Sequence, residues 1–121
     1  LSDCELTILH CTSAYPCRLE DVNLKVLDTF RFYFDGRCSL GISDHTTGIT
    51  VPIAAAALGA TVIEKHFTLD RMDDGPDHKT SITPKEFKGM RLAIFEVIAA
   101  LGDEHKRVLE CEEPLRKAWK R

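Results

Sequence analysis

The sequence predicts an α/β fold in which short buried strands alternate with helices. A strand-like segment is followed by a helix-like segment three times within the 121 residues, and no Gly-x-Gly-x-x-Gly motif follows any of these strands. Such alternation is typical of parallel strands covered by helices. A (β/α)8 barrel needs eight such units and roughly 250 residues, so three units resemble the last part of a barrel more than a whole fold. A fragment of a doubly wound sheet is the alternative, and the absent glycine motif disfavours its dinucleotide-binding form.

The first unit pairs a buried strand with an amphipathic helix. The segment ELTILHCTS (5–13) is predicted to be the strand, and LEDVNLKVLDTFRFYF (19–34) the helix, which Gly36 is placed to end. The apolar positions of this helix are Val22, Leu24, Val26, Leu27 and Phe30.

The second unit has a strand at CSLGIS (38–43) and a helix of small apolar residues at TGITVPIAAAALGA (47–60). Pro52 fits the first turn of that helix, where its missing N–H is not needed. Gly59 occupies the position of a C-terminal cap.

The third unit begins with a strand at TVIEKHF (61–67), passes through a long polar loop (68–83) and ends in a helix (84–102). Thr83 is the expected N-cap, with Pro84 in the first turn. We therefore expect one partial barrel domain over residues 1–102. The charged remainder, 103–121, is expected to be a frayed helix or a linker.

Composition excludes several classes of protein. A net charge of −3 and a pI of about 5.9 argue against strong binding to nucleic acid or to an anionic membrane. No apolar run reaches the ~20 residues of a membrane helix. The five cysteines are odd in number and contain no Cys-x-x-Cys, which favours free thiols in a reducing cytoplasm over a zinc site or disulfides. The first residue is Leu1 and no signal-peptide layout follows, so we expect a piece of a longer cytoplasmic chain.

Two histidines are predicted to lie side by side at the carboxyl ends of neighbouring strands. His45 and His66 end the second and third strand segments, and adjacent parallel strands lie ~4.8 Å apart. Because side chains alternate along a strand, Gly41 and Ser43 share the face of His45, and Glu64 shares that of His66. The pattern predicts a two-histidine metal site, since imidazole is the commonest metal ligand. Ordinary polar strand ends are the alternative interpretation.

The other histidines have different expected roles. His10 lies on the opposite face of its strand from Ser13 and Tyr15, which favours a helix-facing, non-catalytic position. His105 lies in the charged tail and is expected to be solvated. Asp44 and Glu64 could support the metal ligands indirectly, although the parity of Asp44 favours a helix cap.

Hydroxyl and carboxylate groups are expected at the same rim. Ser13 and Ser43 are candidate donors to an anion or a sugar, and the polar loop DRMDDGPDHKTS (70–81) is placed over the same end of the sheet. Within this loop Asp77 follows Gly-Pro, which holds it in a stiff turn. For Asp73 and Asp74 the alternative to a role in the site is a solvated surface position.

Several long motifs in order carry a resemblance to one family. The sequence is similar to the N-acetylneuraminate (sialic acid) synthase family from about residue 6 to 102, through LHCTSAYP (9–16), EDVNL (20–24), GISDHTTGI (41–49), ALGATVIEKHFTLDR (57–71), GPDHKTS (75–81) and P-x-EF (84–87). The resemblance implies the last three strand–helix units of a (β/α)8 TIM barrel. It also implies a linker at 103–121 that leads toward a C-terminal antifreeze-like domain, which this chain lacks.

The resemblance implies an enzyme that condenses phosphoenolpyruvate (PEP) with an N-acetylated hexosamine such as N-acetylmannosamine. The product is a nine-carbon 2-keto sugar acid, and the cofactor is a divalent metal, Mn²⁺ or Mg²⁺. By the same resemblance His45 and His66 bind the metal. In the full-length form, the family acts as a homodimer.

The substrate contacts also follow from the motifs. Ser13 and Ser43 match positions that contact PEP, although Ser13 departs from the asparagine of some bacterial members. Tyr15 and Asp77 match positions that contact the amino sugar. The lysines for the PEP phosphate and the acidic acid/base candidates would lie in earlier strands, outside this chain.

Three alternatives stay open. The substrate could be a precursor of legionaminic acid, of pseudaminic acid or of a spore-coat sugar, and GPDHKTS is more similar to the sialic and legionaminic branches. The chain could also be a non-catalytic remnant that keeps the fold motifs without activity.

Overall fold

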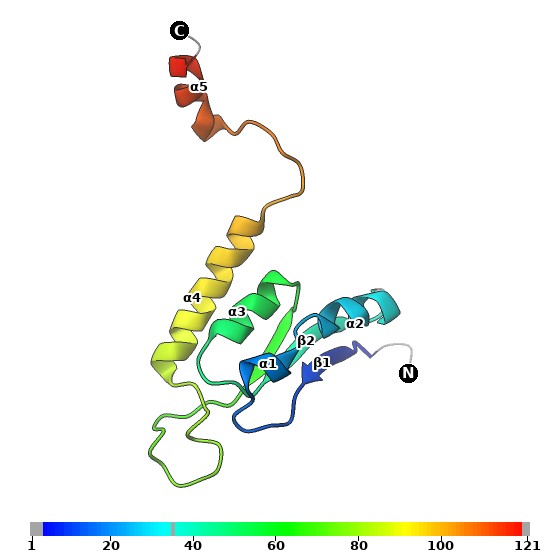
Figure 1. Cartoon of the computed structure of the whole chain (residues 1–121), viewed down its shortest axis with the longest axis vertical. Coiled ribbons are helices and arrows are strands. Elements are labelled where there is room, and N and C mark those ends of the chain that lie inside the picture. The colour runs from blue at the N-terminus through cyan, green and yellow to red at the C-terminus, as the bar shows by residue number, and fades with distance from the viewer. Residues whose placement is uncertain (1–3, 35, 120–121) are drawn as a thin grey trace.

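The protein contains a three-stranded parallel sheet with the strands in the order β1-β2-β3 (Figure 1). The computed structural model describes residues 4–34 and 36–119. Strand β1 spans Thr7–Cys11, β2 spans Ser39–Asp44 and β3 spans Val62–Lys65. The predicted α/β class with parallel strands is therefore confirmed, while the strand bounds are narrower than those expected for the first and third strands.

The register of the sheet sets which side chains share a face. Cys11 pairs with Ser43, and Ser43 pairs with Glu64, so these three side chains form a row across all three strands. Asp44 pairs with Lys65 in the last rung of the β2–β3 ladder. Because side chains alternate along a strand, the Asp44 rung faces the side opposite to the Ser43 row.

The predicted helix over 19–34 is wrong as one element. The structure has a short helix α1 at Leu19–Val22 and a separate helix α2 at Val26–Phe34. Asn23 lies between them with a φ of 49°, a left-handed conformation that ends α1. Asn tolerates this conformation better than most residues, because its short polar side chain can satisfy nearby backbone groups.

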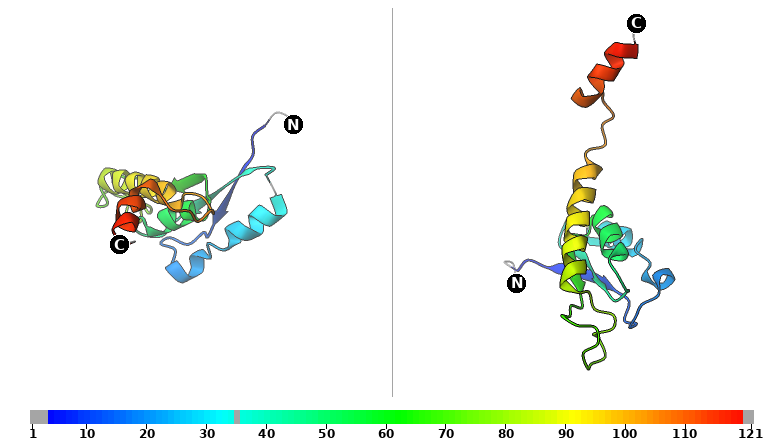
Figure 2. Two further views of the ribbon diagram at one scale, coloured as in Figure 1. Left: turned by 90° about the horizontal axis from the view of Figure 1, so that it is seen from above. Right: turned by 90° about the vertical axis from the view of Figure 1, so that its left-hand side faces the viewer.

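The remaining helices lie close to their predicted positions. Helix α3 spans Thr50–Ala57, shorter than the predicted 47–60, and Gly59 ends it with a φ of 87°. Helix α4 spans Pro84–Leu101, and Thr83 caps it in a capping box with Glu86, as predicted for this threonine. Helices α3 and α4 pack against each other beside the sheet (Figures 1 and 2).

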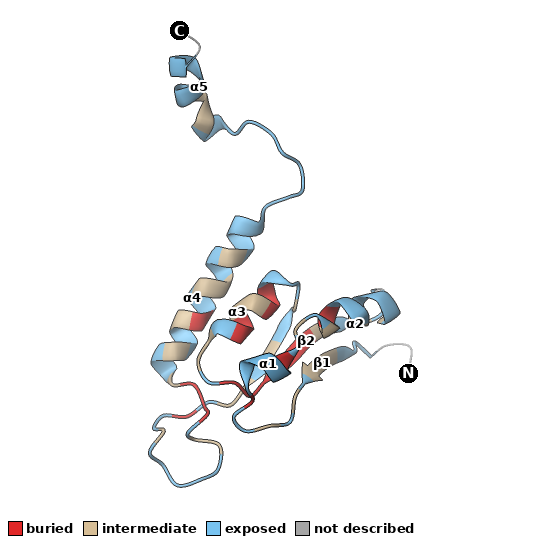
Figure 3. Ribbon diagram, viewed as in Figure 1, coloured by how far each residue is buried: buried red, intermediate tan, exposed pale blue. Residues whose placement is uncertain are grey.

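The core lies between the helices and one face of the sheet. Figure 3 shows buried residues on α2, α3 and β2, which meet there. Leu27 of α2 and Ile42 of β2 are 1% and 2% exposed, and Ala55 of α3 is fully buried. The small alanine side chains let α3 approach the sheet closely, which explains the alanine-rich sequence of this helix. The core fixes the strand ends from which the site residues project.

Two long segments lie outside this core. The loop between β3 and α4 returns to the sheet through a parallel bridge between Phe67 and Ile82. After α4 the chain continues as an extended segment without regular structure. A 3-10 turn (Glu110–Glu112) and helix α5 (Glu113–Trp119) follow. The views of Figures 1 and 2 show α5 projecting away from the sheet. No helix in the described part of the chain has the length and apolar character that crossing a membrane requires.

Candidate functional site

A cavity of about 320 Å³ opens at the carboxyl ends of the strands. Its lining brings together four of the six residues that the sequence predicted for the site: Tyr15, Ser43, His45 and His66. Cys11, Glu64 and Lys65 complete the lining. The strand register explains the gathering, because Cys11, Ser43 and Glu64 form the row that ends beneath the two histidines.

The two histidines face each other across the end of the sheet. Their ring centroids are 5.3 Å apart, with 41° between the ring planes. The ring of Tyr15 lies 4.2 Å from that of His45 and 5.7 Å from that of His66. His45 is only 8% exposed, whereas His66 is half-buried and Tyr15 is 53% exposed. The tyrosine therefore forms the solvent side of the pair.

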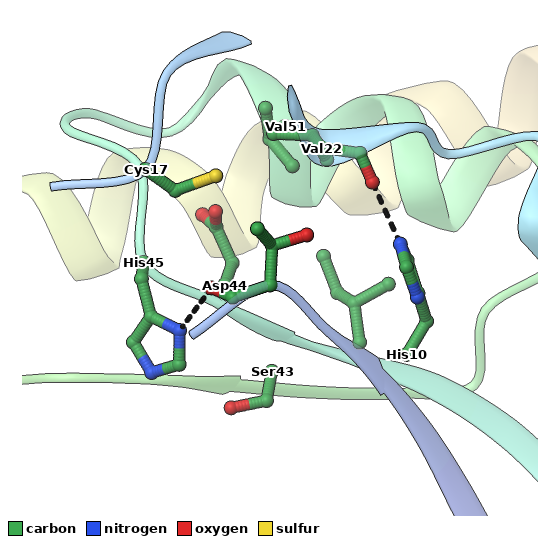
Figure 4. A pocket seen from close by; sticks show the side chains of 9 residues that line it. His10, Cys17, Val22, Ser43, Asp44, His45 and Val51 are labelled. Atoms are coloured by element: carbon green, nitrogen blue, oxygen red, sulfur yellow. Dashed lines mark hydrogen bonds between the residues drawn. The ribbon is translucent and has the colours of Figure 1, made fainter. Parts of the chain in front are cut away.

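Hydrogen bonding orients the ring of His45. Its Nδ1 lies 3.2 Å from the backbone carbonyl of Thr12 (Figure 4). The Sγ of Cys11 lies 3.8 Å from the same nitrogen. A carbonyl oxygen only accepts, so Nδ1 carries the proton and donates it. In the neutral ring Nε2 is then unprotonated, which is the state that a metal ligand requires. The backbone carbonyl of His45 also accepts a hydrogen bond from Cys17 N at 2.9 Å.

His10 and His105 lie where the sequence predicted. His10 Nε2 donates to the backbone carbonyl of Val22 at 2.6 Å, on the helix side of β1 (Figure 4). This contact holds the end of α1 and keeps His10 out of the site. The side chain of His105 is 76% exposed beside Asp103 in the tail.

Ser43 and Glu64 form a direct pair inside the cavity. The hydroxyl of Ser43 donates to Glu64 Oε1 at 2.6 Å. Sequence reasoning placed Glu64 on the face of His66 but gave it no direct part in the site. No sequence signal reveals this pair, because the register that sets Ser43 and Glu64 opposite each other is visible only in the folded sheet.

Asp44 does not cap a helix, and that expectation is wrong. Its carboxylate lies in a buried ion pair with Lys65, with 2.7 Å between Nζ and Oδ2. It also accepts from Thr46 N at 2.9 Å and from Thr46 Oγ1 at 3.1 Å. The N-cap of α3 is Ile49, too far along the chain for Asp44 to replace.

Two predicted residues lie outside the cavity lining. Ser13 is exposed, and its Oγ lies 3.6 Å from the Sγ of Cys11, beside the cavity. Asp77 is half-buried in the loop after β3, where its backbone carbonyl accepts from Thr80 N at 3.2 Å and Ser81 N at 3.0 Å. These bonds confirm the turn expected at Asp77. They do not bring its carboxylate to the histidines.

The loop itself is tied down at both ends. His78 Nδ1 lies 2.7 Å from Thr68 Oγ1, which fixes the middle of the loop to its start. Arg71 donates from Nε to the carbonyl of Ser81 at 3.0 Å and from Nη2 to both carboxylate oxygens of Glu86, at 2.7 and 2.6 Å. The loop after β3 therefore has a defined shape at the same end of the sheet as the loops after β1 and β2 (Figure 1).

The donor set fits a divalent ion that takes most of its ligands from water or substrate. Within residues 4–34 and 36–119 no group of three or more His, Cys, Asp or Glu side chains is arranged to hold a metal. The chain therefore offers two imidazoles, His45 and His66. Two neutral nitrogens with remaining oxygen ligands suit Mn²⁺ better than Ca²⁺.

A smaller cavity of about 10 Å³ lies behind His45, on the helix side of the strands, as Figure 4 shows. His10, Thr12, Cys17, Val22 and Asp44 are among the residues that line it. That volume is about the size of one water molecule. It is too small for a substrate and is therefore not the candidate site.

The chain is similar to proteins named as sugar-acid synthases. The model of the NeuB family matches residues 2–106. The chain is 45% identical over 108 residues to an N,N'-diacetyllegionaminic acid synthase of Campylobacter jejuni, covering 89% of this chain and 32% of the relative. It is 46% identical over 99 residues to a pseudaminic acid synthase of the same species, covering 82% of this chain and 28% of the relative.

A solved structure has the same fold. The crystal structure of an N-acetylneuraminic acid (sialic acid) synthetase from Leptospira borgpetersenii, in complex with citrate, superposes with a TM-score of 0.79 at 33% identity. The match covers 93% of this chain and 39% of that one. The chain thus spans about a third of the length of the relatives that it matches.

Proposed function

The chain belongs to the NeuB family, and from that membership and the cavity we propose that it forms the metal-binding end of a sugar-acid synthase. The reaction is the condensation of PEP with an N-acetylated hexosamine, N-acetylmannosamine or a related sugar, to a nine-carbon 2-keto acid. A carbon–carbon bond forms between C3 of PEP and the aldehyde carbon of the sugar. Addition of water at C2 and loss of phosphate complete the balance.

The single observation that carries this proposal is the pair His45 and His66. Their rings lie 5.3 Å apart at the ends of neighbouring strands, and in a neutral ring the bond from Nδ1 to the Thr12 carbonyl leaves Nε2 of His45 as the ligating nitrogen. In the proposal one ring nitrogen of each histidine holds Mn²⁺ or Mg²⁺. The bound ion would supply Lewis-acid polarisation of the sugar's aldehyde oxygen.

The other residues bind and orient the substrates. The hydroxyls of Ser43 and Ser13 donate to PEP, and Tyr15 packs beside the sugar at the mouth of the cavity. Ser43 donates to Glu64 in the structure, so PEP binding requires its hydroxyl to turn away from that carboxylate. Asp77 accepts from hydroxyls of the hexosamine when the loop lies over the cavity.

The test uses the complete product of the open reading frame that contains this chain. PEP, N-acetylmannosamine and Mn²⁺ are supplied, and phosphate release and keto-acid formation are measured. We expect His45→Ala and His66→Ala each to lower Mn²⁺-dependent condensation at least ~100-fold, because the Lewis-acid contribution is lost. The control is His105→Ala, because this histidine lies in the exposed tail.

Two results would contradict the proposal. Wild-type activity and Mn²⁺ affinity in either His45 or His66 variant would remove the metal site. A complete gene product that binds Mn²⁺ but condenses no sugar with PEP would favour the non-catalytic remnant.

The identity of the sugar is a separate question. Identity to the legionaminic and pseudaminic synthases is nearly equal, at 45% and 46%, so similarity alone does not choose between them. A panel of the N-acetylated and di-N-acetylated hexosamines of these branches, ranked by kcat/KM, separates the alternatives. A spore-coat sugar precursor belongs in the same panel.

The place of the chain in a larger fold is also part of the proposal. Residues 1–102 form the last three strand–helix units of a TIM barrel, and 103–121 form a linker. The extended tail that carries α5 away from the sheet supports the linker (Figure 2). A homodimer is the expected assembly of the complete product, and its mass in solution tests this.

A further inference from the structure

The two residues that directly precede His45 and His66 form a buried ion pair. Asp44 and Lys65 are joined by 2.7 Å between Oδ2 and Nζ, and their side chains are only 1% and 3% exposed. Asp44 is followed by His45, and Lys65 is followed by His66. The ion pair and the histidine pair therefore occupy consecutive positions on the same two strands.

Every oxygen of the Asp44 carboxylate is occupied within this network. Oδ1 accepts from Thr46 N at 2.9 Å, and Oδ2 accepts from Thr46 Oγ1 at 3.1 Å and from Lys65. Lys65 also donates to the backbone carbonyl of Thr46. The two charged groups are thus bound to each other and to Thr46. Together they hold the backbone on both sides of His45.

The ion pair lies where the backbone pairing of the sheet stops. Asp44 and Lys65 form the last rung of the β2–β3 ladder, so the histidines project beyond the paired region. Figure 4 shows the side chains of Asp44 and His45 on opposite sides of β2. The ion pair joins the ends of β2 and β3 on the helix side of the sheet. It therefore limits how far these strand ends can separate, and with them the two histidines on the opposite side.

Stability alone does not call for such a pair. Replacing a buried ion pair by uncharged side chains of similar volume is often neutral or stabilising, whereas removing one partner is strongly destabilising. From these contacts we propose that Asp44 and Lys65 are positioning residues that set the separation of His45 and His66. The assignment rests on the proposed function only in so far as the histidines hold a metal.

The test compares one single and one double variant in the complete gene product. Lys65→Met leaves the Asp44 charge buried without a partner, so we expect a clear loss of thermal stability. The double variant Asp44→Asn, Lys65→Met removes both charges but keeps an acceptor for Thr46 N. We expect its Tm to return to within a few degrees of the parent while its Mn²⁺ affinity stays lower by ~10-fold or more, as for other groups that orient metal ligands.

A second measurement needs no metal. With selectively labelled histidine, the parent should show cross-relaxation between ring protons of His45 and His66, whose centroids are 5.3 Å apart. The double variant should lose or weaken this signal. The matched control is Arg71→Met, Glu86→Gln, which removes a partly buried ion pair in the loop, and it should change neither the signal nor the affinity.

The outcomes separate the positioning role from the proposed function. A folded double variant with unchanged ring contacts and unchanged Mn²⁺ affinity overturns the positioning role. So does a double variant that fails to fold, because the pair then serves stability. Loss of the ring contact in the double variant, with Mn²⁺ affinity unaffected by His45→Ala, keeps the positioning role and removes the metal site.

Discussion

Strand parity correctly predicted the faces of several side chains at the end of the sheet. Ser43 and His45 share a face of β2 and both line the cavity, and His10 points to the helix side as its parity predicted. Parity holds because each of these residues lies in or directly after a regular strand. Asp77 lies in a loop, where no period fixes the direction of a side chain, and its contact with the sugar followed only from the resemblance.

The tautomer of His45 could not be predicted from the sequence. The proton on Nδ1 is fixed by the backbone carbonyl of Thr12, 33 positions earlier in the chain. A backbone carbonyl carries no sequence signal, since any residue at position 12 supplies one. The register of β1 against β2 brings it there, and that register is visible only in the folded chain.

Asp77→Asn tests the substrate assignment at the residue scale. An anionic carboxylate accepts from sugar hydroxyls and repels a phosphate, so its neutralisation should raise KM for the hexosamine by roughly 10-fold, about the value of one charged hydrogen bond. The KM for PEP should stay level or fall. Steady-state kinetics on the complete gene product measure both constants, and equal increases in the two would rule out a sugar-specific role.

At the scale of elements, the sheet depends on a glycine at the centre of β2. A Cβ on Gly41 would overlap the backbone carbonyl oxygen of Val62 and lie 2.7 Å from Cδ2 of Leu9. The sequence showed a small residue on this face but not why it must be small. The reason is the close approach of β3, which a strand pattern alone does not reveal. The break at Asn23 escaped prediction because the apolar period continues across it.

Gly41→Ala should therefore loosen the pairing of β2 with β3. The overlap is with backbone, which cannot rotate away, so we expect a loss of at least ~2–3 kcal/mol in the free energy of unfolding. Gly89→Ala is the control. Gly89 lies inside α4, and a Cβ added there would lie 3.9 Å from Cδ1 of Ile49, an ordinary contact. There alanine should stabilise by up to ~1 kcal/mol. Denaturant unfolding of both variants makes the comparison, and similar values for the two would contradict the close approach.

The capping box of α4 makes a second element depend on pH. Hydrogen bonds from the Thr83 backbone and from Arg71 hold the pKa of Glu86 below its ordinary value, against the opposing effect of burial. A depressed carboxylate pKa stabilises the fold above the unfolded-state pKa, and the stabilisation is lost as the pH falls through the folded-state pKa. The anchoring of the loop by Arg71 should weaken in the same acidic range.

Glu86→Gln isolates that contribution. At neutral pH the variant should be less stable by about 1 kcal/mol, a value limited by the partial exposure of the ion pair. The difference from the parent should shrink between about pH 5 and about pH 3, as Glu86 becomes protonated in the parent. Thermal unfolding across this range measures it, with Glu96→Gln, at an exposed position of the same helix, as the control. A difference that stays constant with pH would refute the role of the charge.

At the scale of the whole molecule, the described chain leaves unusually large surface uncovered. Its accessible surface is 9354 Å² for a mass of 13.6 kDa. A compact monomer of this mass exposes roughly 6,600 Å². Along α4 the side chains of Phe95, Ile98 and Leu101 are 55%, 53% and 55% exposed. The α/β class could be predicted from the sequence because it depends on local alternation, whereas what covers these surfaces depends on contacts that no local pattern encodes.

Residues 1–121 in isolation are therefore expected to lack a stable, active monomeric fold. Parallel sheets are ordinarily covered on both faces, but here Cys11 and Glu64 are exposed on the face opposite the helices, and both β1 and β3 are edge strands. Ordering a residue costs ~1–2 kcal/mol in conformational entropy, so a chain that buries too little apolar surface has no margin. We expect aggregation or a loosely packed globule with no turnover of PEP. Thermal unfolding together with the mass in solution tests this, and a cooperative transition from a monomer would show that three strands and their helices suffice.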